Sequence, residues 1–476
     1  MTTSADPLCK LATHSLSPAS REYKQAVDHM VKQHASELAP IHPHLSSSSK
    51  RFLQKVVDMM RHADRNWKSS VVEELTPRID EAYMANIRSK HWYEWIAPPL
   101  RDILDRDTKI GRQYKLSIHG KTVDVHFIVP HTTMRLHPES FSEKNREKYW
   151  QHAIRRMVVW LYVAYSFAHE TCQHHSTMYI FMTYSKKESL TYDDPLQPVH
   201  TNSGASNVCL ATGHLLVYRY EEWFKVFLHE TFHFLGLEFS QAYEDHAAEL
   251  RSIVARAFPR CLPTTKWLIY ETYCETWAEI LNVVFLSFYG RNARTHTRWM
   301  THVHRRGRKP SHATTTRRFQ DVFACHSIVA QVEAYLQYEQ WFSLLQCVKL
   351  LKHFQLTYAE LFTQDTEHAY DHAERYDLFS YHVLKSIWMY RVNDFIEWCV
   401  AHNQYGDDAQ VSLDFMKTRD AMMDYVKTMI GYSRDKELLL GYEQAEKWLL
   451  HGAPTALVAG NKIVPIQKTL RMTMFD

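Results

Sequence analysis

The sequence predicts an α+β protein, in which a core of one small twisted sheet and one motif-bearing helix is embedded in a mostly helical chain. Three patterns support this class. Apolar residues recur at helical spacing near both ends of the chain, hydrophobicity alternates with period two between residues 114 and 129, and an apolar run at 226–235 contains an HExxH motif. With 476 residues, of which 45% are hydrophobic, the chain can bury a large core.

The N-terminal part of the chain divides into two segments. Residues 1–20 are polar and are predicted to be flexible. In residues 21–108, Phe52, Val56 and Met60 share one helical face, so a helical N-terminal domain is expected.

Residues 109–290 are predicted to form the core that contains the sheet. Segments 114–118 and 123–129 alternate on either side of His119-Gly120, which predicts a β-hairpin. The elements expected after the hairpin are, in order, a helix at about 142–167, a strand at about 178–184, a loop through 202–204, a strand at about 210–218 and the HExxH helix.

The HExxH motif is formed by His229, Glu230 and His233. Positions four apart lie on one helical face, so both imidazoles can point at one metal ion while the intervening glutamate serves as general base. The chain holds 31 histidines, so the motif alone is weak evidence. Its flanks are apolar and free of Gly and Pro, which indicates a buried helix rather than a solvated one. The alternative is a pair of core histidines with a locally bonded glutamate.

A zinc site needs a third protein ligand and an open fourth position. A metzincin would place this third ligand at residue 239, which is Phe. A gluzincin takes a carboxylate from a later helix, where Glu271, Glu275 and Glu279 recur at intervals of four. Glu275 is the predicted ligand, and Glu279 is predicted to fix the tautomer of a ligand histidine. Glu271 is the alternative ligand. If it does not bind the metal, it is expected to contact the residues that do. An acidic stripe paired with Lys and Arg is the competing interpretation.

Two further segments are assigned to the site. The strand before the HExxH helix is expected to be the sheet edge that binds the substrate backbone, and its predicted substrate-binding residues are His214, Leu215, Leu216 and Val217. Residues 319–476 are expected to form a helical C-terminal domain. There Tyr381 and His382 are candidates for stabilising a developing oxyanion, against the alternative that they are ordinary buried helix residues.

Composition excludes several classes of protein. The chain has only 12 Gly and no phosphate-binding glycine motif, and its net charge of +3 indicates no global affinity for nucleic acid or membrane. Eight widely spaced cysteines without a CxxC pair favour a reducing compartment. Neither a secretory signal nor an apolar run of membrane-spanning length is present, so a cytoplasmic rather than secreted protein is expected.

Residues 291–318 form a strongly basic segment. They include nine Lys or Arg and four His but no acidic residue, and a disordered loop is predicted. Such a loop can bind nucleic acid or an acidic partner, and a merely solvated loop is the alternative.

The segments Glu221–His233 and Tyr273–Ala278 resemble zincin-like proteins of large nucleocytoplasmic DNA viruses, over about residues 110–400. The resemblance implies a gluzincin-type ligand set with one Zn²⁺, and a viral protein that acts in the host cytoplasm or is packaged in the virion. It implies no particular substrate.

These patterns predict a zinc metallopeptidase that hydrolyses a polypeptide substrate. Zinc is expected on His229, His233 and Glu275, with Glu230 as general base for the attacking water. The alternative is a catalytically inactive zincin-fold protein with a structural or interaction role, such as a virion component.

Overall fold

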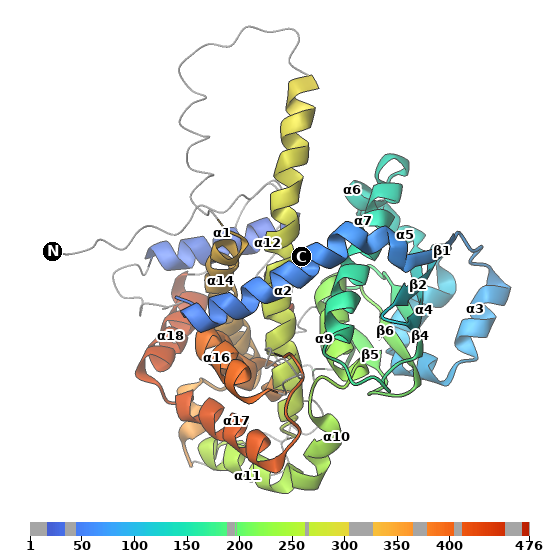
Figure 1. Cartoon of the computed structure of the whole chain (residues 1–476). Helices are drawn as coiled ribbons and strands as arrows, with labels where there is room; N and C mark the ends of the chain where they lie inside the picture. Colours follow the sequence, from blue (N-terminus) through green and yellow to red (C-terminus); the bar gives the residue numbers. More distant parts are fainter. Residues whose placement is uncertain are drawn as a thin grey trace, which may run out of the picture.

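The computed structural model describes residues 17–33, 44–187, 196, 198–261, 266–303, 327–364, 378–403, 412–452 and 469–475. The predicted α+β class is confirmed, because helices predominate and one mixed sheet is present (Figure 1). Most of the predicted N-terminal segment 1–20 lies outside the described residues.

The six-stranded sheet has the order β1-β2-β3-β4-β6-β5. The β3–β4 and β4–β6 pairs are parallel, and the other neighbours are antiparallel. The predicted hairpin is confirmed as β2 and β3, which turn at His119 and Gly120 with positive φ at both residues. The strands are β1 Val71–Leu75, β2 Lys109–Ile118, β3 Lys121–Pro130, β4 His175–Phe181, β5 Gly204–Ser206 and β6 Thr212–Val217.

Two predictions about this sheet are wrong. Strand β1 lies within residues 21–108, for which only helices were expected. The segment His214, Leu215, Leu216 and Val217 belongs to β6, which is not an edge strand because β4 and β5 flank it. The edge beside β6 is instead β5, which has only three residues and was predicted as loop.

The helices are α1 Pro18–Gln33, α2 Ser47–Asn66, α3 Glu81–Arg88, α4 Pro98–Arg106, α5 His131–Leu136, α6 Pro138–Phe141, α7 Glu143–Tyr165, α8 Pro198–Thr201, α9 Trp223–Phe234, α10 Ser240–Tyr243, α11 Ala247–Ala257, α12 Ile269–Val303, α14 Ile328–His353, α15 Lys385–Tyr390, α16 Val392–His402, α17 Arg419–Tyr432 and α18 Lys436–Lys447. Short 3₁₀ turns are η2 Trp67–Ser70, η3 His91–Trp95, η4 Glu244–His246 and η5 Ala359–Phe362, and π-helical turns are η7 Ser380–Leu384 and η8 Trp448–Gly452.

Helices cover both faces of the sheet. On one face, alternate residues of β3 such as Val125 and Phe127 join a large core with α2, α7, α9 and α12. On the other face, Tyr179 and Phe181 of β4 pack on a smaller cluster from α3, η3 and α4, where the Trp92 ring lies 4.6 Å from that of Tyr179. Because successive side chains of a strand point to opposite faces of the sheet, the strands contribute to two separate apolar clusters.

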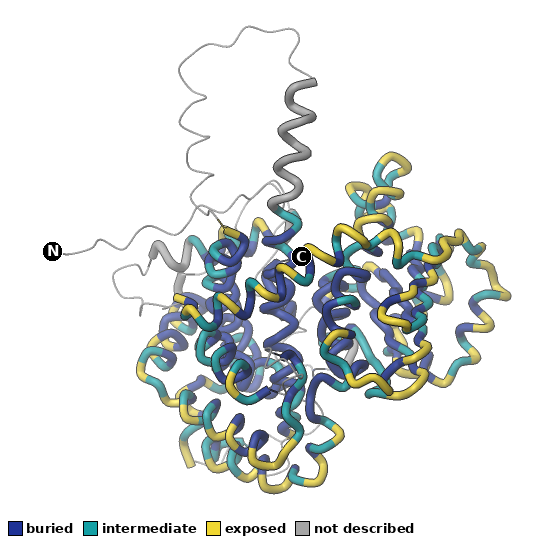
Figure 2. The backbone as a smooth tube through the Cα atoms, in the orientation of Figure 1, coloured by how far each residue is buried: buried dark blue, intermediate teal, exposed yellow. Residues whose placement is uncertain are grey.

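Helix α12 runs through the middle of the molecule, between the sheet and the C-terminal helices (Figure 1). The buried backbone gathers along it and around the sheet (Figure 2). The large core extends from Tyr23 to Phe475 and so includes side chains from 21–108, 109–290 and 319–476. Helix α12 ends at Val303 and so includes the first residues of the segment 291–318, which was predicted to be disordered. Residues 304–318 lie outside the described residues.

The segment Thr469–Phe475 is buried although it forms no helix. Glu222 accepts hydrogen bonds from two of its consecutive backbone N–H groups, at 2.9 and 2.7 Å, and Glu339 accepts from the two that follow. These carboxylates replace the backbone partners that a strand or helix would supply. The segment is thereby fixed against α9 and α14, and its Met472 reaches the cavity described below.

No helix among the described residues is both long enough and apolar enough to cross a membrane.

Cys172 and Cys209 form a disulfide, contrary to the expectation of reduced cysteines. It ties the loop after α7 to the loop between β5 and β6. Both loops contact the end of α9, where the Phe234 carbonyl accepts hydrogen bonds from the Cys209 backbone N–H and the Gln173 side chain, at 3.2 and 2.9 Å. The pairing escaped sequence analysis because 37 residues separate the cysteines and no spacing motif marks them.

Replacing both Cys172 and Cys209 with alanine is expected to lower the free energy of unfolding by about 4 kcal/mol, the chain-entropy value for a loop of this length. Denaturant unfolding measures the change. Reduction of the wild type should produce a similar loss, whereas Cys261→Ala, which removes an unpaired thiol, should not. Unchanged stability of the double variant would contradict the pairing.

Candidate metal centre

Helix α9 carries the HExxH motif, and all twelve of its residues are buried. The chain enters it through Glu222 in the left-handed region at φ 57° and leaves it through Gly236 at φ 62°. The Gly236 N–H donates to the His233 carbonyl at 2.9 Å and the Leu237 N–H to the Phe232 carbonyl at 2.8 Å, which is a Schellman end. The helix therefore stops immediately after the second histidine, and Phe239 packs on Phe415 in the core rather than facing the site.

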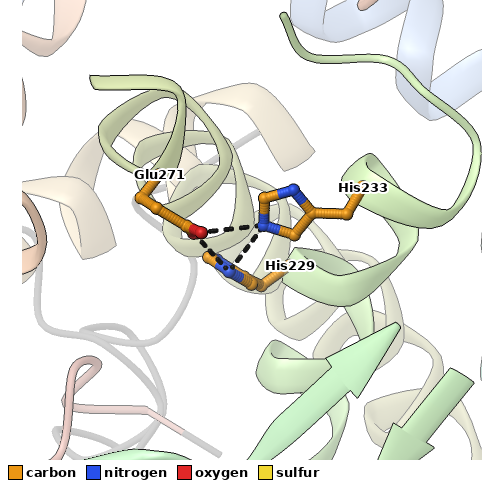
Figure 3. Close-up of side chains that lie close together, drawn as sticks. All are labelled: His229, His233 and Glu271. Atoms are coloured by element: carbon orange, nitrogen blue, oxygen red, sulfur yellow. Dashed lines mark hydrogen bonds and ion pairs between the residues drawn. The ribbon is translucent and has the colours of Figure 1, made fainter. Parts of the chain in front are cut away.

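His229, His233 and Glu271 converge on one point (Figure 3). The two Nε2 atoms are 3.3 Å apart, and Glu271 Oε2 lies 3.2 Å from that of His229 and 3.1 Å from that of His233. Ligands at ordinary Zn–N and Zn–O bond lengths in a tetrahedron stand about 3.3 Å from one another. The triangle thus has the dimensions of three zinc ligands.

The three acids of α12 share one face, and their positions are displaced by one helical turn from the predicted arrangement. Glu271, the alternative ligand, occupies the place predicted for Glu275. Glu275 Oε2 instead lies 2.9 Å from Nδ1 of His229, the orienting position that was predicted for Glu279. Glu279 is farther along the helix and accepts a hydrogen bond from Lys385 Nζ at 2.5 Å.

Each histidine has a carboxylate beside its Nδ1 atom. For His229 this is Glu275, whose other oxygen accepts a short hydrogen bond from Lys225. For His233 it is Glu238, with Oε1 at 3.4 Å. A proton held on Nδ1 leaves the Nε2 lone pair for a metal.

The buried charges shift one another. Burial raises the pKa of Glu271, but His233 and the hydrogen bonds from both histidines outweigh it and hold the pKa below its ordinary value. Burial likewise opposes ionisation of Glu275, yet Lys225 and then His229 bring its pKa well below the usual range. Burial lowers the pKa of Lys225, but Glu275 more than compensates, so its pKa is raised. These groups are therefore held as ions inside the protein.

The general-base candidate Glu230 is held by the edge strand. Ser206 of β5 donates a hydrogen bond from Oγ to Glu230 Oε2 at 2.9 Å. Gly204 of the same strand lies so close that a Cβ atom there would stand 2.6 Å from Glu230 Oε1. Burial raises the pKa of Glu230, against the lowering effect of His229 and His233. A raised pKa suits a carboxylate that takes up and returns a proton.

A cavity of about 370 Å³ opens on the triangle. Residues 204–206 and the predicted residues Tyr381 and His382 are among those that line it. The Tyr381 ring lies 6.0 Å from that of His229. Burial, followed by the charge of Lys385, brings the pKa of His382 well below its ordinary value, so its imidazole is neutral.

The sequence brought His229, Glu230, His233, Tyr381 and His382 to attention, and all five line this cavity. It missed four contributors: Gly204, Ser206, Lys225 and Glu238. Of these, only Lys225 and Glu238 could have been noticed in the sequence, because they are the charged residues on either side of the apolar motif. No spacing rule points to the other two.

The donor set fits zinc: two imidazole nitrogens and one carboxylate oxygen, with a further carboxylate beside the Nδ1 atom of each histidine. Among the described residues this is the one group of three or more such side chains with metal-binding spacing.

Comparison of the chain with protein-family models, with curated proteins and with solved structures finds no match. The resemblance to viral zincin-like proteins therefore stays a prediction.

Replacing Gly204 with alanine is expected to lower the free energy of unfolding by about 1–3 kcal/mol, because the new methyl group overlaps Glu230 and Val226. Urea denaturation provides the measurement. Gly431→Ala is the matched control. Its Cβ meets nothing within 4 Å and it lies in α17, so alanine there should be neutral or stabilising by up to about 1 kcal/mol. Equal effects of the two substitutions would contradict the tight approach of β5 to α9.

Proposed function

We propose that this protein is a zinc-dependent peptidase with a gluzincin-type site, in which His229, His233 and Glu271 hold the metal. One observation carries the proposal: three ligand atoms at zinc spacing face a cavity in which Glu230 is held by an edge strand. A zinc ion at this place supplies Lewis acidity and promotes the deprotonation of water near neutral pH.

Glu230 is the residue that moves the proton. Its carboxylate accepts a proton from the attacking water and later donates it to the amide nitrogen that leaves as an amine. The Ser206 hydroxyl holds one carboxylate oxygen in place, because it donates to Oε2. Glu230 itself lines the cavity.

Strand β5 is proposed to bind the substrate backbone. Among the described strands, it stands at the end of the sheet order with β6 on its inner side, so its outer side can pair with an extended peptide. The same strand holds Glu230 through Ser206, so a peptide on β5 lies close to the general base. Tyr381 and neutral His382, which also line the cavity, are proposed to hydrogen-bond to the developing oxyanion.

The rival function is a structural or interaction role without catalysis. A structural zinc takes four protein ligands, whereas the described residues supply a group of three beside an open cavity. This difference favours the enzyme. The structure describes no side chain of residues 291–318. Binding of nucleic acid or an acidic partner through that segment therefore stays a separate proposal.

Purified wild type is expected to contain about one zinc per chain, and Glu230→Gln should retain the zinc while losing most hydrolysis, because it removes the proton acceptor but no ligand. Elemental analysis measures zinc, and a library of fluorescence-quenched peptides measures hydrolysis. Zinc-loaded wild type that cleaves no library member would favour the structural role, and wild type without affinity for zinc would overturn the metal centre.

The assignment of Glu271 rather than Glu275 as ligand can be tested separately. Glu275→Gln should weaken zinc binding about 10- to 100-fold, the usual effect of losing a partner of a ligand histidine. Glu271→Gln should weaken it much further, because a ligand oxygen is replaced by an amide. Competition with a chromophoric chelator measures both affinities. The reverse order would restore the role originally predicted for Glu275.

A further inference from the structure

Lys225 is the one Lys or Arg of helix α9 and lies one turn before His229. Its side chain is only 3% exposed, as is that of Glu275, with which it pairs. A buried ion pair loses the hydration of both groups, and apolar replacements of such pairs are often neutral or stabilising. Stability of the fold therefore does not explain why a lysine stands here.

The position of the pair suggests another reason. Lys225 Nζ donates to Oε1 of Glu275, while Oε2 of the same carboxylate lies 2.9 Å from Nδ1 of His229. Both oxygens of Glu275 are thus engaged, one by the ammonium and one by the imidazole. A carboxylate held at one oxygen cannot rotate freely about its terminal bond, so the other oxygen stays directed at the histidine.

We propose that Lys225 is a positioning residue of the metal centre, which acts through Glu275 to orient His229 so that its Nε2 atom faces the ion. The chain of contacts runs from the Lys225 ammonium to the Glu275 carboxylate, to the imidazole, and ends at the triangle of ligand atoms. This role deepens the proposed function and rests on it, because it requires a metal at His229.

A second buried pair supplies the matched control. Lys385 donates to Glu279 at 2.5 Å, and both side chains are 0% exposed. Glu279 lies one turn beyond Glu275 on α12, and Glu279 contacts neither histidine through any recorded bond among the described residues. Lys385→Met therefore removes the ammonium partner of a buried carboxyl group on the same helix as Lys225→Met does, without releasing a partner of His229.

The experiment compares zinc affinity in Lys225→Met, Lys385→Met and wild type by chelator competition, together with the visible absorption of the Co²⁺-substituted proteins. Lys225→Met is expected to weaken zinc binding about 10-fold or more and to change the Co²⁺ spectrum, as losing an orienting partner does. Lys385→Met should also lower the unfolding midpoint. Its zinc affinity should stay within about twofold of that of the wild type, and its Co²⁺ spectrum should be unchanged.

The double variant Lys225→Met with Glu275→Gln tests the route of the effect and leaves no unpaired charge in the pair, so it guards against misfolding of the single variant. If Lys225 acts through Glu275, the double variant should bind zinc as Glu275→Gln alone does, because the effects of coupled residues are not additive. Independent, multiplying losses would overturn the proposal, as would wild-type affinity in Lys225→Met or an equal loss in Lys385→Met. Wild type without any zinc would instead overturn the proposed function, and this role with it.

Discussion

The contact between α9 and α12 is the constraint on which the site depends. Both helices are buried where they meet, yet that contact holds His229, Lys225 and the acids of α12. These charged side chains are buried, so each is stabilised by an opposite partner within the contact. The acids and bases alternate accordingly: Glu271 faces both histidines, Glu275 lies between His229 and Lys225, and Glu279 is paired with Lys385.

This alternation explains the register of α12. Shifted by one turn, the helix would bring Glu275 to the two Nε2 atoms, but Lys225 would then face Glu279 and Lys385 would lose its partner. In the observed register, every charge of the contact has a counterpart. The acid that meets the two histidines is therefore determined by the pairing of the lysines at 225 and 385 as much as by the histidines themselves.

Sequence alone could predict the residues of α9 and the presence of an acidic face on α12, because both follow from helical periodicity. It could not decide between Glu271 and Glu275, since a repeat of four looks the same in either register and the partner Lys385 is remote in sequence. Strand β5 was missed for a different reason: three residues including Gly204 are too few to show alternation. Consequently the substrate-binding role was assigned to β6, the more apolar neighbour, whose Leu215 and Val217 alternate because they enter the core.

The short strand also bears on whether the centre is catalytic or structural. Glu230 lies between His229 and His233 in sequence and is buried, so its carboxylate is a candidate for a fourth ligand, which would close the proposed site. Ser206 binds its Oε2, and the missing side chain at Gly204 gives its Oε1 and Cγ room beside β5. The carboxylate is thus drawn toward the edge strand, and the group of metal-binding spacing contains only three members. A structural zinc site would not require a strand that lines the cavity and holds a possible ligand away from the metal. Such a strand is what a site requires when the fourth position must stay open for a reacting water.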